Sequence, residues 1–217
     1  MLVQIKKALQ DVGYGGDLDR CSSDLAWYLS ELILWNRKIN LIGRSTEEEV
    51  LTRHLVESAL YYSYTRGKKV VCDIGTGAGL PGIVLAIMMS GCEDSFFYLI
   101  DKDHKKCNFM RHVSSQLKLK NIEIIENRVE EDKRLNSGIA SIVISRALAD
   151  LCTLTDLSEP LLANGGGMVF MKGPAAEEEL ESLCSVKKKY IGKSCVDSYV
   201  KVGGREIKMV RLSPESL

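Results

Sequence analysis

The amino-acid sequence predicts an α/β fold in which helices cover both faces of a mostly parallel, seven-stranded sheet. Three observations support this prediction. From residue 69 onward, short apolar runs alternate with amphipathic stretches, which indicates strands that alternate with helices. The first apolar run leads directly into a glycine-rich stretch, VVCDIGTGAGLPG (70–82). Near the end of the chain, Gly203-Gly204 separates two further runs, which is typical of an antiparallel hairpin.

The first 66 residues are predicted to be helical. In segment 22–39, leucines and isoleucines recur at spacings near three and four. A second helix is expected to begin at Ser45, because Glu48 three residues later completes the pattern of a capping box. Gly67 is the break before the first strand. We therefore expect a helical N-terminal extension (1–66) that packs on an α/β domain (67–217).

Within that domain, the apolar runs predict strands at 69–74, 96–101, 122–127, 140–147, 166–172, about 190–202 and 205–212. The stretches between them predict helices at 81–90, 103–119, 151–163 and 175–184. Pro81 suits the first turn of its helix, whereas Pro160 is expected to kink the third one.

The composition excludes several classes of function. The chain has 217 residues, of which 45% are hydrophobic and 27% charged, and no apolar run approaches the length of a membrane span. Its formal net charge is zero, so a nucleic-acid substrate must meet a local basic patch or belong to a structured particle. The seven scattered cysteines and the lack of a secretory layout at the N-terminus favour a cytoplasmic protein with reduced thiols and no metal site.

Polar residues follow several of the predicted strands at the point where each strand ends. They are Asp73 and Gly75, Asp101, the segment 127–130, Arg146 and Lys172. Ligands of parallel sheets bind beyond the carboxyl ends of the strands, where the strand order reverses. We therefore expect these residues to surround one ligand site, with Arg146 and Lys172 at its exposed rim.

Two ligands compete for the glycine-rich stretch. Gly77, Gly79 and Gly82 match the G-x-G-x-x-G of dinucleotide-binding proteins, while Asp73 and the glycines after it match the D-x-G-x-G-x-G of S-adenosylmethionine (SAM) methyltransferases. Asp101 can accept the ribose hydroxyls of either ligand. Asp73 favours SAM, because a carboxylate there can hold an ammonium group and would repel the pyrophosphate of NAD. Glu130, near an adenine amino group, is consistent with SAM.

Each of these residues also has a purely structural interpretation. Asp73 could cap the glycine turn, and Arg146 and Lys172 could be surface residues paired with acids. Trp35 lies at helical spacing and is expected in the core rather than as a platform for a base.

Several blocks of the sequence resemble one enzyme family. They are WNRKINL (35–41), RHLVESA (53–59), DIGTGAGLPGIVLAI (73–87), LKLKNIEIIENRVEE (117–131), ISRA (144–147) and MKG (171–173). On these blocks the chain is similar to the RsmG (GidB) family of bacterial 16S rRNA methyltransferases, which methylate N7 of a guanine in the 530 loop. The glycine block alone indicates the class, whereas the combination of WN-x-x-x-N-L, RH-x-x-x-S and GTGAG-x-PG indicates the family.

The resemblance implies a Rossmann-like, class I SAM-dependent methyltransferase that acts on 16S rRNA, within a small-subunit particle and as a monomer. It implies SAM contacts at Gly75, Leu80, Val129, Glu130 and Arg146, to which the residue-level argument adds Asp73, Gly77 and Asp101. Arg146 and Lys172 are the expected residues of the methyl-transfer site. The segment Lys102-Asp103-His104 is less typical of the family, so contacts at that helix start are uncertain.

The chemistry of guanine N7 agrees with this interpretation. N7 carries a free lone pair, so the enzyme has to hold donor and acceptor in line and needs no base. The chain contains neither the [DN]-P-P-[FYW] motif of exocyclic-amine methylation nor a Pro-Cys pair. A small-molecule methyltransferase, a non-catalytic SAM sensor and an NAD oxidoreductase remain as alternatives at this stage.

Overall fold

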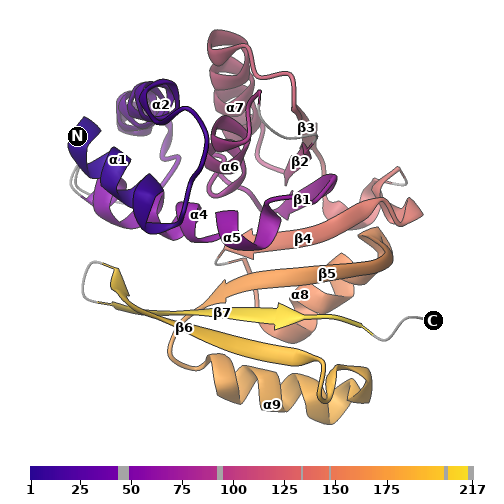
Figure 1. Cartoon of the computed structure of the whole chain (residues 1–217). Helices are drawn as coiled ribbons and strands as arrows, with labels where there is room; N and C mark the ends of the chain where they lie inside the picture. The colour runs from indigo at the N-terminus through magenta and orange to yellow at the C-terminus, as the bar shows by residue number, and fades with distance from the viewer. Residues whose placement is uncertain (44–48, 92–94, 133, 147, 203–204, 215–217) are drawn as a thin grey trace.

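A computed structural model of the chain describes residues 1–43, 49–91, 95–132, 134–146, 148–202 and 205–214 (Figure 1). Its strands form a single sheet with the order β3-β2-β1-β4-β5-β7-β6. Five of them are parallel: β1 (Val70–Ile74), β2 (Phe96–Asp101), β3 (Ile122–Glu126), β4 (Ala140–Arg146) and β5 (Leu162–Lys172). The last two are β6 (Ser194–Val202) and β7 (Arg205–Leu212); β7 lies between β5 and β6 and is antiparallel to both. This sheet confirms the predicted fold class.

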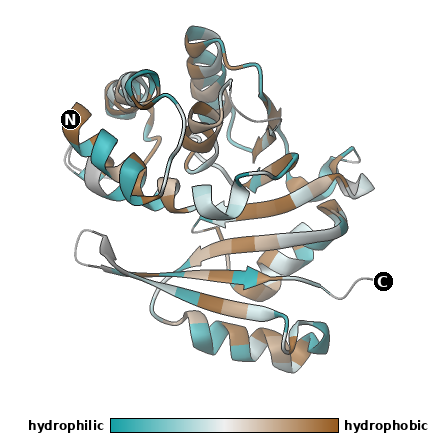
Figure 2. Cartoon of the chain, viewed as in Figure 1, coloured by the Kyte–Doolittle hydropathy of each residue, from teal (hydrophilic) through white to brown (hydrophobic). Residues whose placement is uncertain are grey.

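Two hydrophobic clusters lie on opposite faces of the sheet. Along β1, Val71 faces one cluster, while Cys72 and Ile74 face the other, as the alternation of a strand requires. Figure 2 shows hydrophobic residues along the central strands, whereas the outer helices have mixed surfaces. The helices that cover the first face include α6 (Gly82–Met88) and α7 (His104–Leu117), and those on the second are α8 (Leu151–Ser158) and α9 (Ala176–Val186).

The N-terminal segment adds further helices to the first face. They are α1 (Leu2–Asp11), α2 (Leu18–Ile39), the π-helical turn η1 (Val50–Leu55), α4 (Val56–Leu60) and α5 (Tyr62–Thr65). Leu25, Leu29 and Leu32 are buried, as their spacing predicts. The expected capping box at Ser45 and Glu48 lies outside the described residues. Trp35 is half-buried and packs against Phe109 of α7, with 5.5 Å between ring centroids.

Hydrogen bonds join this extension to the α/β domain. The Tyr28 hydroxyl donates to the Ala78 carbonyl in the glycine-rich loop at 3.0 Å. The buried Tyr61 hydroxyl donates to the Ser145 carbonyl of β4 and accepts from the Met171 amide of β5. The two parts also share one hydrophobic cluster. The sequence pattern changes at residue 66 from helical to alternating strands and helices. The division of the chain into two domains at this residue stays a prediction.

The largest departure from the predicted elements is at Pro160. The helix was expected to continue to residue 163 with a kink, but α8 ends at Ser158. Pro160 instead lies in a 3-10 turn (Glu159–Leu161), and β5 begins directly afterwards at Leu162. Proline removes the amide that an α-helix needs at this position, so the chain leaves the helix instead of bending it.

The C-terminal hairpin is confirmed, because Val202 and Arg205 are register partners. Its turn, Gly203-Gly204, lies outside the described residues. Strand β6 starts four residues later than expected, because 188–190 form a 3-10 turn. Within the described part of the chain, none of the helices has the length and apolar character that a membrane span needs.

Candidate functional site

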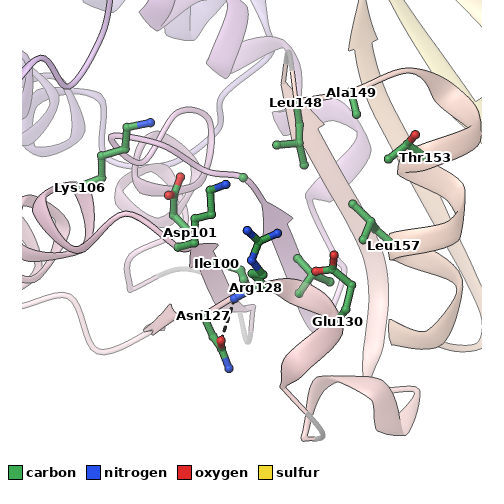
Figure 3. Close-up of a pocket in the computed structure, with 13 residues that line it drawn as sticks. Ile100, Asp101, Lys106, Asn127, Arg128, Glu130, Leu148, Ala149, Thr153 and Leu157 are labelled. Atoms are coloured by element: carbon green, nitrogen blue, oxygen red, sulfur yellow. Dashed lines mark hydrogen bonds between the residues drawn. The ribbon is translucent and has the colours of Figure 1, made fainter.

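A cavity of about 400 Å³ opens at the carboxyl ends of the parallel strands (Figure 3). It lies where the strand order reverses, between β1 and β4. Of the predicted site residues, Gly75, Asp101, Val129 and Glu130 line it. Asp73, Gly77, Leu80, Arg146 and Lys172 lie outside its lining, and the first three belong to β1 and the loop that follows it, which also contain the lining residue Gly75.

The glycine-rich loop needs its glycines for different reasons. Gly75, Gly77 and Gly79 have φ values of 67°, 63° and 92°, a region that favours glycine. A Cβ at Gly77 would meet nothing within 4 Å, so this part of the loop is open to a ligand. A Cβ at Gly82 would lie 2.3 Å from Leu99 Cδ2 and 2.7 Å from Asp73 Oδ2, which requires glycine for packing.

Asp73 is fully buried at the end of β1. Its Oδ2 accepts hydrogen bonds from Thr76 Oγ1 at 2.6 Å and from the Gly82 amide at 2.8 Å. Its Oδ1 is buried and has no hydrogen-bond partner in the described part of the chain. Burial raises the pKa of this carboxyl group to about 7. Asp73 therefore caps the glycine loop, as its structural interpretation required, and still has one oxygen for a donor.

Asp101 connects the loop to the end of β2. Its Oδ2 accepts a hydrogen bond from the Gly77 amide at 2.8 Å, and its Oδ1 accepts one from the Asp103 amide at 2.9 Å. Each carboxylate oxygen has a second lone pair, so the group can still accept two hydroxyl donors. The less typical segment after it is regular, because Asp103 caps α7 by accepting from the amides of Lys105 and Lys106.

Further residues line the cavity besides those that the sequence analysis named. Leu148, Thr153 and Leu157 line the wall that follows β4, and Leu148 lies over Gly75. Figure 3 shows Arg128 and Glu130 reaching into the cavity from the segment after β3. Thr153 and Leu157 are four residues apart and therefore lie on one face of α8. This spacing is the sequence signal that could have placed both of them on the cavity wall.

Arg146, at the end of β4, is held by the N-terminal extension. Its Nη1 donates to Glu57 Oε2 at 2.7 Å and lies 2.9 Å from His54 Nδ1. The other oxygen of Glu57 accepts from Arg53 Nε at 3.2 Å. Burial, together with the charges of Arg146 and Arg53, lowers the pKa of His54 to about 4. His54 is therefore neutral at pH 7 and its Nδ1 acts as an acceptor.

Lys172 is also buried and paired. Its Nζ donates to the Ala149 carbonyl at 2.7 Å and pairs with Glu179 Oε2 at 2.7 Å. Only 10% of the Lys172 side chain and 14% of the Arg146 side chain are exposed. The expectation that both lie at an exposed rim is wrong, because each side chain is mostly buried against an acidic partner, Glu57 for Arg146 and Glu179 for Lys172.

The reversal of strand order, the antiparallel last strand, the glycine loop after β1 and the acid at the end of β2 define a class I SAM-dependent methyltransferase. The model of the family described as rRNA small subunit methyltransferase G (GidB) matches residues 22–208. The chain belongs to this family.

Curated relatives agree with this assignment. The chain is 44% identical over 184 residues to the ribosomal RNA small subunit methyltransferase G of Magnetococcus marinus, with 82% of each chain covered. It is 35% identical over 196 residues to the protein of the same name from Paramagnetospirillum magneticum, covering 88% of this chain and 91% of the relative. The family confirms that the protein is a methyltransferase with SAM as its cofactor.

Solved structures show the same fold at low identity. The O-methyltransferase TomG from Streptomyces achromogenes, in complex with SAM, has a TM-score of 0.59 at 14% identity and covers 86% of this chain and 89% of its own. The ribosomal protein L11 methylase from Lactobacillus delbrueckii has a TM-score of 0.57 at 15% identity, with 75% and 79% covered. At these identities the likeness extends to the fold alone.

Proposed function

We propose that this protein transfers the methyl group of SAM to N7 of a guanine in the 530 loop of 16S rRNA. The observation that carries the proposal is the name shared by its curated relatives, ribosomal RNA small subunit methyltransferase G. The site geometry supports the chemistry, because the residues at the strand ends fit a ligand with an ammonium group and a ribose.

In this proposal, the free Oδ1 of Asp73 accepts the ammonium group of SAM, and Asp101 accepts the ribose hydroxyls. The backbone at Gly75, Gly77 and Leu80 approaches the ligand closely. Val129 and Glu130, on the opposite wall, contact the adenine. SAM supplies a methyl group on a positively charged sulfur, and the protein holds this sulfur and N7 in line.

Arg146 and Lys172 have different parts in the proposed reaction. We assign Arg146 to the methyl-transfer site, and its partly exposed guanidinium is suited to a carboxylate of SAM or an rRNA phosphate. Lys172 acts through its bond to the Ala149 carbonyl, because Ala149 lines the cavity. We therefore propose Lys172 as a residue that shapes the cavity wall.

The three histidines are engaged in ways that do not suit a general base. His54 Nδ1 faces Arg146, His104 Nδ1 lies 2.7 Å from Glu126 Oε1, and His112 Nε2 lies 2.8 Å from Glu31 Oε2. An N7 acceptor needs none, since no proton leaves before the methyl group is transferred.

We also propose that the substrate is a small-subunit particle and that the enzyme acts on it as a cytoplasmic monomer without a metal. The zero net charge supports a structured particle, because it leaves little long-range attraction for naked RNA. A small-molecule substrate is the remaining alternative. The membership of the rRNA methyltransferase family argues against it, as well as against an NAD oxidoreductase and a non-catalytic sensor.

The deciding experiment uses tritiated SAM and small ribosomal subunits from cells that lack this enzyme. We expect label in one nucleotide of 16S rRNA, mapped to a guanine of the 530 loop, with the methyl group on N7. Deproteinised short hairpins of the same loop should accept little label. Label in another nucleotide, or none at all, contradicts the proposal.

A further inference from the structure

The N-terminal extension supplies a group of charged and polar side chains around Arg146, in which His54 and Glu57 are buried and Arg53 is half-buried. We call it the Arg146 cluster; it consists of Arg53, His54, Glu57 and Arg146. His54 and Glu57 are each 7% exposed. Both come from the consecutive elements η1 and α4, whereas Arg146 ends β4, so the cluster connects two distant parts of the chain.

The contacts of Arg146 are concentrated on one nitrogen. Nη1 carries two hydrogens, and two acceptors lie beside it: Glu57 Oε2 at 2.7 Å and His54 Nδ1 at 2.9 Å. Both hydrogens of Nη1 are thereby used, which fixes the plane of the guanidinium. In the described part of the chain, Nε and Nη2 have no hydrogen-bond partner, so this edge of the planar group is left for a ligand.

The elements that supply the two acceptors have further contacts. Arg53 Nε binds the second oxygen of Glu57 at 3.2 Å, and the Ser58 hydroxyl donates to the backbone carbonyl of His54 at 2.6 Å, which fixes the turn that carries the imidazole. His54 lies in the π-helical turn η1, a backbone form that often occurs at functional sites. The Glu57 carboxylate is therefore held by a second arginine, and His54 is carried by a hydrogen-bonded turn, so both acceptors of Arg146 come from an ordered part of the extension.

The Arg146 cluster has a net positive charge, which favours binding of an anion. Arg53 and Arg146 carry two positive charges, Glu57 carries one negative charge, and His54 is neutral. A buried ion pair of this kind is weak support for stability alone, because removing its charges from water is costly. An excess positive charge at the end of β4 is instead suited to a carboxylate of SAM or a phosphate of RNA.

We propose that Glu57 and His54 are positioning residues for methyl transfer, which hold the guanidinium of Arg146 so that its Nε and Nη2 edge faces the ligand. This inference rests on the proposed function in one respect, namely that Arg146 contacts SAM or substrate. It gives the N-terminal extension a direct part in the reaction, because the extension supplies both acceptors.

The test measures SAM affinity by calorimetry and the single-turnover rate on small subunits for Glu57→Gln, His54→Ala and His54→Asn. Glu57→Gln and His54→Ala should slow methyl transfer by roughly tenfold to a hundredfold, the cost of a misplaced group at a reacting centre. His54→Asn should recover much of the rate, because the asparagine oxygen can take the place of Nδ1 as an acceptor.

A double-mutant cycle separates positioning from a general structural role. In an Arg146→Ala background, Glu57→Gln should cause no further loss of SAM affinity or rate, because the group that it positions is gone. The matched control is Glu159→Gln, since Glu159 is a partly buried carboxylate that binds Lys187, Lys189 and Tyr190 and lies outside both the Arg146 cluster and the cavity lining. It should lower the melting temperature without changing rate or affinity.

The outcomes distinguish this inference from the proposed function. If wild-type protein places no label on rRNA, the proposed function fails, while the SAM affinities still report on the cluster. If wild-type protein is active, unchanged rates in Glu57→Gln and His54→Ala overturn the inference. The inference is also overturned if Glu57→Gln lowers the rate further in the Arg146→Ala background. It is overturned as well if His54→Asn and His54→Ala lose the same amount of rate. If Glu57→Gln does not fold, the comparison of the two His54 variants decides.

Discussion

At the scale of single residues, Asp73 is the group of the proposed cofactor site whose ionisation the fold changes most clearly. In the ligand-free chain, burial raises its pKa from 3.8 to about 7. Between these values the folded state binds more protons at Asp73 than the unfolded state does. The free energy of unfolding should therefore decrease as pH rises from about 4 to 7, by on the order of 4 kcal/mol from this residue. Denaturant titrations of wild type and Asp73→Asn, compared across that range, measure the difference.

Binding of SAM should release a proton from the same carboxyl group. An ammonium group beside Oδ1 favours the carboxylate and lowers its pKa, so at pH 6 the protonated Asp73 must ionise when SAM binds. Calorimetry at pH 6 in buffers of different ionisation enthalpy should show release of nearly one proton. Asp73→Asn should bind SAM weakly and without proton release. An observed enthalpy that is independent of the buffer would remove Asp73 as the ammonium partner.

Asp101 is the residue that should contribute most to ribose binding. Asp101→Ala should weaken SAM binding by about 1.5–3 kcal/mol, the typical range for hydrogen bonds to a charged group. Asp103→Ala is the matched control, because Asp103 caps the neighbouring helix α7 and lies outside the cavity lining. That variant should lose about 1 kcal/mol of stability and keep its SAM affinity. Wild-type affinity in Asp101→Ala would show that another group holds the ribose.

At the scale of elements, Lys172 connects β5 to the starts of α8 and α9. Lys172→Ala leaves Glu179 with only the Leu151 amide among its described contacts and frees the Ala149 carbonyl. We expect a loss of roughly 2 kcal/mol in stability, together with a weaker affinity for SAM, because Ala149 lines the cavity. Both effects are measured on one sample, by denaturant unfolding and calorimetry.

Lys208 provides a close control for that variant. It is the register partner of Lys172 on β7, its side chain is 11% exposed, and it pairs with Glu177 of the same helix α9. Lys208→Ala should also lower stability, while SAM affinity stays at the wild-type value. An equal loss of affinity in both variants would mean that Lys172 acts through the general stability of α9 and not through the cavity wall.

Particular elements show how much of this arrangement can be predicted from sequence. Asp101, Gly75, Val129 and Glu130 were placed at one site because their positions follow from strand ends in a parallel sheet, which local pattern reveals. The burial of Arg146 was missed because its partner Glu57 lies 89 residues earlier. No local pattern reports how the extension packs on β4, and the wall residue Leu148 depends on the same tertiary placement.

At the scale of the whole molecule, the absence of a required proton transfer has a measurable consequence. In the proposed site, saturating SAM holds Asp73 as a carboxylate through the bound ammonium group, so its free-state pKa near 7 should no longer affect the reaction. His54 has its pKa near 4 and stays neutral above about pH 5. Neither the sulfonium of SAM nor neutral guanine titrates between about pH 6 and 8.5. We therefore expect a nearly flat single-turnover rate on small subunits across that range.

His104→Gln/His112→Gln serves as the control, because both side chains pair with surface or half-buried glutamates away from the cavity lining. Its rate should stay within a few-fold of wild type over the same range.

At subsaturating SAM, the rate of methyl transfer should instead change with pH, because SAM binding then includes the ionisation of Asp73. The variant Asp73→Asn should remove that change. An acceptor that must lose a proton, such as an alcohol or an amine, would give a rising limb even at saturation. A tenfold rise traced to one side chain at saturating SAM would therefore contradict transfer to N7.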